Sequence, residues 1–150
     1  MNRFAVLHHE IPSHRPLITG SPEGIRGSHW DWMFEDNGIL MTWATEWEPA
    51  IGKEGPALRL GDHRLDYLEY EGEISQGRGH VRRLLEGTFR FTRKSDCLLE
   101  LDLAGDFSCQ LHLEWKVSPL DTASNIQPPR EVLKGCPTQE WILRTCSKPG

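Results

Sequence analysis

An imidazole and a carboxylate stand two positions apart in the segment HWDWMFE, at His29 and Asp31. The segment alternates polar and apolar residues, which predicts a strand on which these two side chains share one face. Together they supply two of the ligands that a divalent metal ion requires, and His9, at the end of the apolar segment RFAVLHH, is a candidate third. The alternative is a hydrogen-bonded surface pair, because a His-x-Asp spacing is short enough to occur by chance.

A second group of side chains suited to proton chemistry lies in the segment DHRLDY, which contains His63 and Tyr67. If this segment forms a helical turn, the two residues are four apart and share a face. An imidazole and a phenol so placed can bind an oxyanion or transfer a proton. A tyrosine packed over a loop histidine is the alternative interpretation.

Basic residues are concentrated in one part of an acidic chain. The formal net charge is -5, whereas residues 78–94 hold six basic side chains, Arg82 among them, and one acidic side chain. Such a local basic stretch suits contact with phosphate near a site, while the acidic remainder argues against a protein that coats a duplex. Solvated strand faces explain the stretch equally well.

The elements that must position these residues are strands. Many short alternating segments separated by turns, with no long helical pattern, predict an all-β fold. We expect a small closed or nearly closed β-barrel with one or two short helical turns, because closure removes exposed strand edges. The predicted strands are 3–9, 29–35, 39–45, 81–85, 87–92, 97–103, 108–117 and 141–145; the predicted loops are 10–28, 46–56 and 119–129, with helical turns within 62–70 and a short turn at 131–134.

The length and amino-acid composition indicate the broad class of protein. The chain has 150 residues, of which 37% are hydrophobic and 26% charged, and this is typical of one soluble globular domain spanning 1–150. No apolar stretch approaches the roughly 20 residues of a membrane span, and the start lacks the pattern of a signal peptide. The four cysteines form no CxxC pair, so we expect reduced thiols in a cytoplasmic monomer.

Together the motifs resemble the 3′-phosphoesterase domain of bacterial DNA ligase D, and we expect a stand-alone member of that family. FAVLHHE resembles the opening strand that ends in a histidine, here His9 and not His8. HWDWMFEDNGILMTWA resembles the block H-x-D-x-R-x-E…G-x-L-x-S-W-A, and DHRLDYLEYEG is similar to D-H-P-L-D-Y-x-x-F-E-G. VRRLLEGTF and WILR resemble later strands, so the resemblance spans most of the chain.

The resemblance implies a metal-dependent phosphoesterase that removes a 3′-terminal ribonucleotide and then a 3′-phosphate in DNA repair and end joining. It places the metal, manganese by preference and zinc as the alternative, on His9, His29 and Asp31. It assigns catalytic roles to His63 and Tyr67 together with His29. The implied partners are a DNA or RNA/DNA 3′ end and a DNA ligase, a polymerase or an end-binding repair protein.

Two positions depart from the family pattern in ways that affect phosphate binding. Met33 stands where the family has arginine, and Trp47 stands where it has lysine; the interval between His9 and His29 is also longer. These losses motivate an alternative function, a catalytically weak or inactive metal- and DNA-end-binding repair module in which Trp47 stacks on a base. A non-haem iron oxygenase would use similar ligands, but no arginine pattern for an oxo-acid accompanies them. The candidate replacement cations are Arg59, Arg64, Arg78, Arg15 and Arg26.

Overall fold

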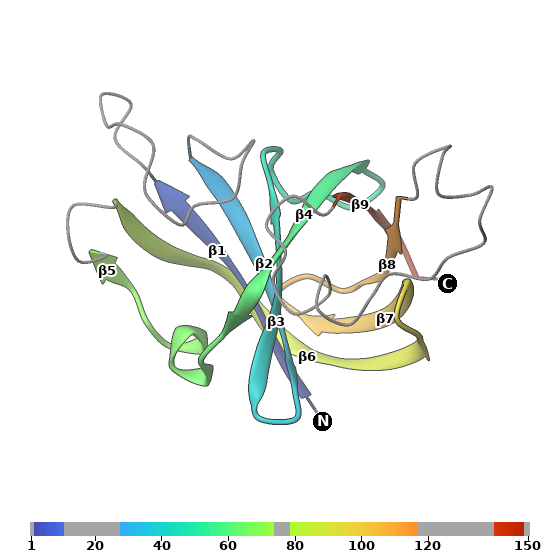
Figure 1. Cartoon of the computed structure of the whole chain (residues 1–150), viewed down its shortest axis with the longest axis horizontal. Helices are drawn as coiled ribbons and strands as arrows, with labels where there is room; N and C mark the ends of the chain where they lie inside the picture. Colours follow the sequence, from blue (N-terminus) through green and yellow to red (C-terminus); the bar gives the residue numbers. More distant parts are fainter. Residues whose placement is uncertain (1, 11–27, 74–78, 117–139, 149–150) are drawn as a thin grey trace.

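A computed structural model describes residues 2–10, 28–73, 79–116 and 140–148 of the chain (Figure 1). The one helical element among them is a four-residue 3-10 helix, so none of the described helices is long and apolar enough to cross a membrane. The elements in chain order are β1 (Asn2–Glu10), β2 (His29–Asp36), β3 (Ile39–Thr45), β4 (Glu54–His63), η1 (Leu65–Leu68), β5 (Gly72–Glu73), β6 (His80–Lys94), β7 (Leu98–Gly105), β8 (Cys109–Trp115) and β9 (Glu140–Cys146).

Eight of the strands form one closed antiparallel barrel. Their order is β1-β2-β3-β4-β9-β8-β7-β6, and pairing of β6 with β1 closes the ring. The two-residue β5 adds to the outer edge of β6. The predicted all-β fold with a closed barrel and a short helical turn is therefore confirmed.

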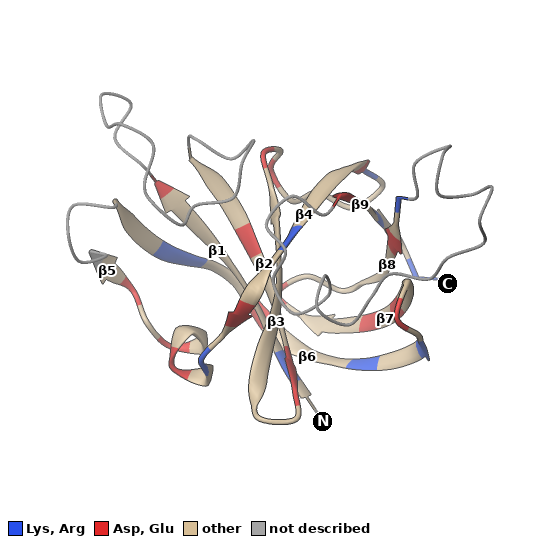
Figure 2. Ribbon diagram, in the orientation of Figure 1, with Lys and Arg blue, Asp and Glu red and all other residues tan. Residues whose placement is uncertain are grey.

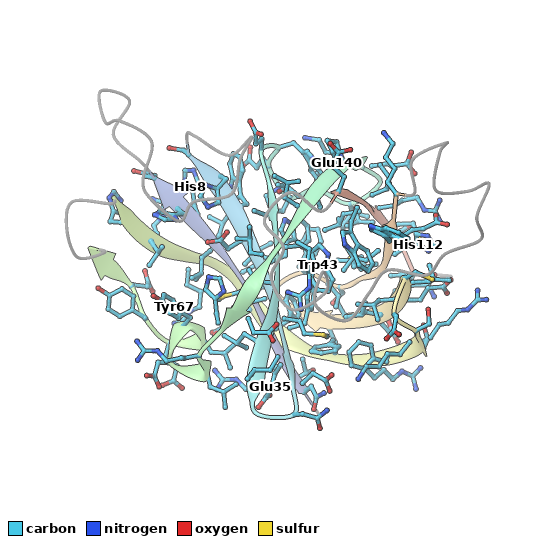
Figure 3. All side chains as sticks on the ribbon, viewed as in Figure 1. His8, Glu35, Trp43, Tyr67, His112 and Glu140 are labelled. Atoms are coloured by element: carbon cyan, nitrogen blue, oxygen red, sulfur yellow. The ribbon has the colours of Figure 1, made fainter. Side chains whose placement is uncertain are left out.

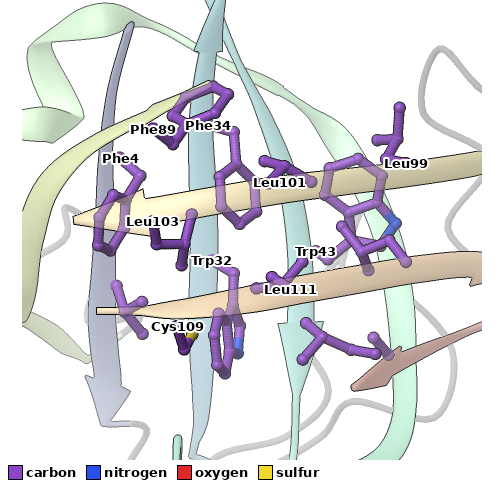
Figure 4. Close-up of a cluster of buried hydrophobic side chains, with 14 of the residues drawn as sticks. Phe4, Trp32, Phe34, Trp43, Phe89, Leu99, Leu101, Leu103, Cys109 and Leu111 are labelled. Carbon is purple, nitrogen blue, oxygen red and sulfur yellow. The ribbon is translucent and has the colours of Figure 1, made fainter. Parts of the chain in front are cut away.

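The barrel interior is filled mainly by aromatic and leucine side chains, and every strand of the ring contributes at least one buried apolar residue. Phe34 from β2 packs edge-to-face against Trp43 from β3, with ring centroids 6.0 Å apart, and Trp43 packs in the same way on Trp141 from β9. Figure 4 shows the Phe34 and Trp43 rings beside the leucines of β7 and β8. Burial of each such side chain contributes about 1.5–3 kcal/mol, which makes this cluster the main source of stability.

A second apolar cluster lies on the outer face of β1, β2, β3 and β6. Its members Leu7 and Met33 alternate along their strands with the interior residues, and η1 covers them through Leu68. Strands β1 and β2 are consequently buried on both faces, which explains their unbroken runs of buried residues. The cover provided by η1 makes this part of the outer face a second, smaller core.

A β-bulge near the end of β4 decides which face His63 occupies. Leu60 pairs with Thr42 and His63 pairs with Leu40, so two residues of β4 oppose the single residue between them on β3. The extra residue reverses the alternation, and Leu60 and His63 share the outer face. Without the bulge, His63 would point to the opposite side of the sheet.

Two elements differ from the sequence prediction. Strand β4 occupies part of the predicted loop 46–56 and the start of the predicted helical segment, because Gly55, Pro56 and Gly61 conceal its pattern. The two predicted strands 81–85 and 87–92 are one continuous strand, β6. Gly87 does not break it: a Cβ there would lie 2.0 Å from the Ala104 carbonyl oxygen, so glycine permits the close approach of β7.

The predicted turn at 131–134 lies outside the described residues, as do 11–27 and 119–129 of the predicted loops.

Candidate metal centre

The three predicted metal ligands meet on the outer face, at one end of strands β1 and β2. His9 and His29 are directly opposite each other in the β1–β2 register, and Asp31 follows two residues along β2. One ligand atom from each residue can be chosen so that all lie within 4.8 Å of one another. The His29 Nε2 lies 3.2 Å from the Asp31 Oδ1, and the His9 Nδ1 lies 3.9 Å from the Asp31 Oδ2.

The Asp31 carboxylate is held in an unusual setting for an acidic group. Only 5% of the residue is exposed, and among the described residues nothing forms a hydrogen bond of good geometry with its Oδ1. Burial by itself would raise the pKa of Asp31, but the nearby imidazoles of His29, His63 and His9 outweigh it and hold the pKa below its usual value. A buried and ionised carboxylate oxygen without a well-aligned hydrogen bond is a natural ligand for a cation.

The donor set fits a divalent transition metal ion. Two imidazoles and one carboxylate suit manganese or zinc better than calcium, which prefers oxygen ligands. Ligand atoms that share one ion at about 2.0–2.2 Å from each lie roughly 3–3.5 Å apart. The 3.2 Å contact between His29 and Asp31 already has that spacing, and His9 needs only a small shift. Three protein ligands also leave coordination positions for a phosphate or a water.

His63 and Tyr67 lie together beside this cluster, although not on one helix as the sequence suggested. His63 ends β4 and Tyr67 lies on η1, and the turn between them brings their rings to a centroid distance of 5.2 Å. His63 is close enough to Asp31 to lower the pKa of that carboxyl group. All five predicted catalytic and metal residues are therefore gathered on the same outer face of the barrel.

A backbone contact fixes the orientation of the His63 ring. The Nδ1 lies 2.9 Å from the carbonyl oxygen of Gly61, and a carbonyl can only accept, so the Nδ1 donates this hydrogen bond. The Nε2 is then the nitrogen that gains or loses a proton. This arrangement, supplied by the bulge residue Gly61, leaves one defined nitrogen for acid–base chemistry.

The predicted phosphate ligand Arg59 does not belong to this site. It is 5% exposed, its side chain points into the barrel, and the guanidinium lies over the Trp43 ring at 4.6 Å. Its nitrogens donate hydrogen bonds to the carbonyl oxygens of Thr42 and Leu60 and to the Asp62 carboxylate. Because the bulge separates Arg59 from the face that carries His63, this arginine anchors β4 and cannot contact phosphate there.

Four of the five basic residues that the structure describes in the stretch 78–94 face a carboxylate. Arg90 pairs with Asp102 at 3.4 Å, and acidic residues also face the basic ones at the far end of β6. Figure 2 shows basic and acidic positions side by side on β6 and β7. The structure therefore favours solvated strand faces over a phosphate-binding stripe along β6.

Of the other predicted phosphate ligands, Arg64 alone is placed near the candidate centre. It is exposed and directly follows His63, at the start of η1. Arg82 is exposed and pairs with His8, so it lies on the face opposite to His9. Arg78 lies outside the described residues, as do the loop residues Arg15 and Arg26.

The sequence analysis missed Arg83, which lies on the same face as the site. A bulge in β6 pairs Leu7 with Arg83 and leaves Leu84 unmatched. The Arg83 Nη1 donates a 2.8 Å hydrogen bond to the carbonyl oxygen of Leu68 and so ties η1 to the barrel. The sequence shows Arg82 and Arg83 side by side, but it does not show the bulge that puts Arg83 on the face of the site.

The two departures from the family pattern are both built into the packing. Met33 is completely buried beneath η1, on the face where the family has arginine. The Trp47 Nε1 donates a 2.9 Å hydrogen bond to the Pro56 carbonyl oxygen. The Trp47 ring lies against Gly55 and 5.2 Å from the Lys53 ammonium. These contacts make Trp47 a packing residue and argue against its stacking on a base.

Comparison with known proteins adds nothing to this geometry. No family model matches the chain, and no curated protein matches it. The residues of the candidate metal centre and their arrangement are therefore the evidence that bears on function.

Proposed function

We propose that the protein is a metal-dependent phosphoesterase that acts on nucleic-acid 3′ ends. The observation that carries this proposal is the convergence of His9, His29 and Asp31 with the oriented imidazole of His63 on one face of the barrel. Manganese or zinc bound by the first three residues would polarise a phosphoryl oxygen and lower the pKa of a bound water. The substrate class, a DNA or RNA/DNA 3′ end, comes from the family resemblance.

The chain's own acid–base group in this proposal is His63. Hydrolysis of a 3′-phosphate breaks the bond between phosphorus and the 3′ oxygen, and that oxygen must gain a proton as it leaves. With the Nδ1 bound to the Gly61 carbonyl, the protonated Nε2 of His63 donates this proton. Tyr67, in edge contact with the imidazole, limits how the ring can turn.

Phosphate binding relies on fewer cations than the family pattern supplies. Met33 provides no donor, and Arg59 is fully engaged inside the barrel. We assign phosphate contact to Arg64, because it follows His63 directly and is exposed. We also propose that the protein acts as a cytoplasmic monomer beside a DNA ligase, a polymerase or an end-binding protein.

The proposal is tested with labelled DNA carrying a 3′-phosphate or a 3′-terminal ribonucleotide, incubated with manganese, with zinc, or with a chelator. We expect metal-dependent formation of a 3′-OH end, which is lost in His29→Ala. The matched control is His8→Ala, since His8 neighbours His9 on β1 but faces the other way and stacks on Trp30 at 4.7 Å. No product with either metal from a folded protein would overturn the proposal.

A second candidate function is a metal- and DNA-end-binding repair module without efficient turnover. Complete burial of Met33 favours it, because the phosphate then loses a cation that catalysis normally uses to offset developing charge. Tight binding of a 3′-phosphorylated end by the wild type, with no product, would support this function. Absence of binding to DNA ends would exclude it.

A further inference from the structure

A row of aromatic rings leads away from the candidate metal centre. It begins at His63, passes to Tyr67 at 5.2 Å and continues to Tyr70 at 6.1 Å, and both contacts are edge-to-face. Figure 3 labels Tyr67 beside the helical turn η1, at the margin of the barrel. The row therefore connects the proposed acid–base group with the outer surface of the protein.

The last ring of the row is exposed. Tyr70 is 40% exposed, although a large aromatic side chain gains free energy from burial. Its hydroxyl group lies beside Gly72, where a Cβ would be 3.5 Å from the oxygen, and its ring edge contacts Tyr67. An exposed ring that continues an aromatic row from a site is suited to stacking on another planar group.

The charges around Tyr70 are compensated. Its neighbours in sequence, Glu69 and Glu71, pair with Arg3 at 3.5 Å and with Arg83 at 3.9 Å. The two arginines reduce the repulsion that these carboxylates would exert on a nucleic-acid backbone. The acidic residues still disfavour a phosphate directly beside the ring, so the part of a nucleotide that suits this position is the uncharged base.

We propose that Tyr70 is a base-stacking residue that selects unpaired 3′ ends. This inference rests on the proposed function and deepens it by naming the substrate class, a single-stranded or frayed strand terminus. With the 3′-phosphate at His9, His29, Asp31 and His63, the strand runs over Tyr67 and a base near the terminus stacks on Tyr70. A base held in a blunt duplex is already stacked and paired, and it must be unpaired before it can occupy this position.

The test measures binding of the full-length protein, with manganese, to a fluorescent single-stranded oligonucleotide that ends in a 3′-phosphate. Tyr70→Ala is expected to weaken binding about tenfold, since stacking of a base on an aromatic side chain typically has this effect or more. Tyr70→Trp is expected to keep or improve the affinity. Ile51→Ala, at an exposed apolar residue between β3 and β4, is the control and is expected to bind as the wild type does.

A second oligonucleotide series identifies the contact as stacking. Abasic sugars replace the bases near the 3′ end one at a time, and one replacement should weaken binding by the wild type but not by Tyr70→Ala. The wild type should also prefer the single strand to the same end in a blunt duplex. The inference is overturned if Tyr70→Ala binds as the wild type does, if no abasic replacement acts through Tyr70, or if the wild type binds no oligonucleotide.

Failure of the inference differs from failure of the proposed function. If the wild type produces a 3′-OH end and Tyr70→Ala matches it in affinity and in KM, only the role of Tyr70 is lost. If Tyr70→Ala raises KM about tenfold with kcat unchanged, the stacking role is supported. If no end is processed, the proposed function fails regardless of the binding series.

Discussion

Trp32 and Met33 are neighbours on β2 and both are completely buried, but they belong to different cores. Trp32 points into the barrel, where aromatic and leucine side chains from all around the ring surround it. Met33 points outward, into a small cluster formed by η1 and a few apolar side chains of β1, β3 and β6. One strand thus contributes to a large core made by the whole sheet and to a small one made by a single helical turn.

The difference shows how the barrel can hold a polar centre without losing stability. The interior cluster is stabilised by contacts among all eight strands of the ring, and these contacts do not involve the outer face. The outer face is then free to change character along β2, from apolar Met33 under η1 to ionised Asp31 only two residues away. The buried polar groups are placed where the smaller core ends.

The largest expected effect concerns the polar part of the outer face. His63→Gln removes the proposed proton donor, and we expect the rate of 3′-phosphate removal to fall by about 10²–10⁴-fold, the usual contribution of general acid–base catalysis. The thermal unfolding temperature should change little, because His63 is only half buried. Rate measurements at saturating substrate test this, and a rate within a few-fold of the wild type would remove His63 from the mechanism.

The next effect separates the two cores. Trp32→Ala should lower the free energy of unfolding by about 3–5 kcal/mol, since it opens a cavity in the barrel and deletes the Nε1 hydrogen bond to Thr45. Met33→Leu, which conserves volume in the outer cluster, should cost less than about 1.5 kcal/mol. Urea unfolding monitored by circular dichroism measures both, and equal costs would show that the two cores are not distinct.

A smaller effect concerns pH. The pKa of Asp31 is held below its usual value, so its ionised form stabilises the fold above the unfolded pKa, near 3.8, and this stability is lost as pH falls through the lower folded value. In chelator-treated protein, Asp31→Asn should therefore lose less stability than the wild type between pH 7 and pH 3. Urea midpoints at both pH values test this prediction. Equal losses in the two proteins would contradict the electrostatic account of the centre.

The smallest effect is a difference between two thiols. Burial in the interior raises the pKa of Cys109 to about 12, whereas Cys146 is exposed at the end of β9. Iodoacetamide at pH 8 should modify Cys146 and spare Cys109, because the thiolate is the reactive form. Mass spectrometry of peptides from the native protein distinguishes them. Modification of Cys109 at the same rate would show that the barrel interior is open to solvent.

The comparison also explains what the sequence could predict. Strict alternation at residues 29–35 correctly predicted β2, its aromatic inner face and the pairing of His29 with Asp31, since period-two patterns carry that information directly. The bulges in β4 and β6 leave no such pattern. Each shifts the alternation by one residue, and for this reason the positions of Arg59 and Arg83 could not be predicted from the chain alone.

The helical turn illustrates the same limit in another way. The spacing of His63 and Tyr67 suggested one helical face, and the two rings do meet, but through the end of a strand and a 3-10 turn. The burial of Met33 depends on this turn folding back over β2, which is a tertiary contact. The spacing of His63 and Tyr67 therefore predicted that these candidate residues meet, but not the elements that carry them.

Direct measurement of manganese binding is the best test of whether His9, His29 and Asp31 bind one divalent metal ion. Titration of the wild type, followed by electron paramagnetic resonance, should show one bound manganese ion per chain. The account predicts that His9→Ala abolishes this binding and that His8→Ala, one residue away on the other face of β1, retains it. Binding that survives in His9→Ala, or is lost equally in His8→Ala, would contradict the account.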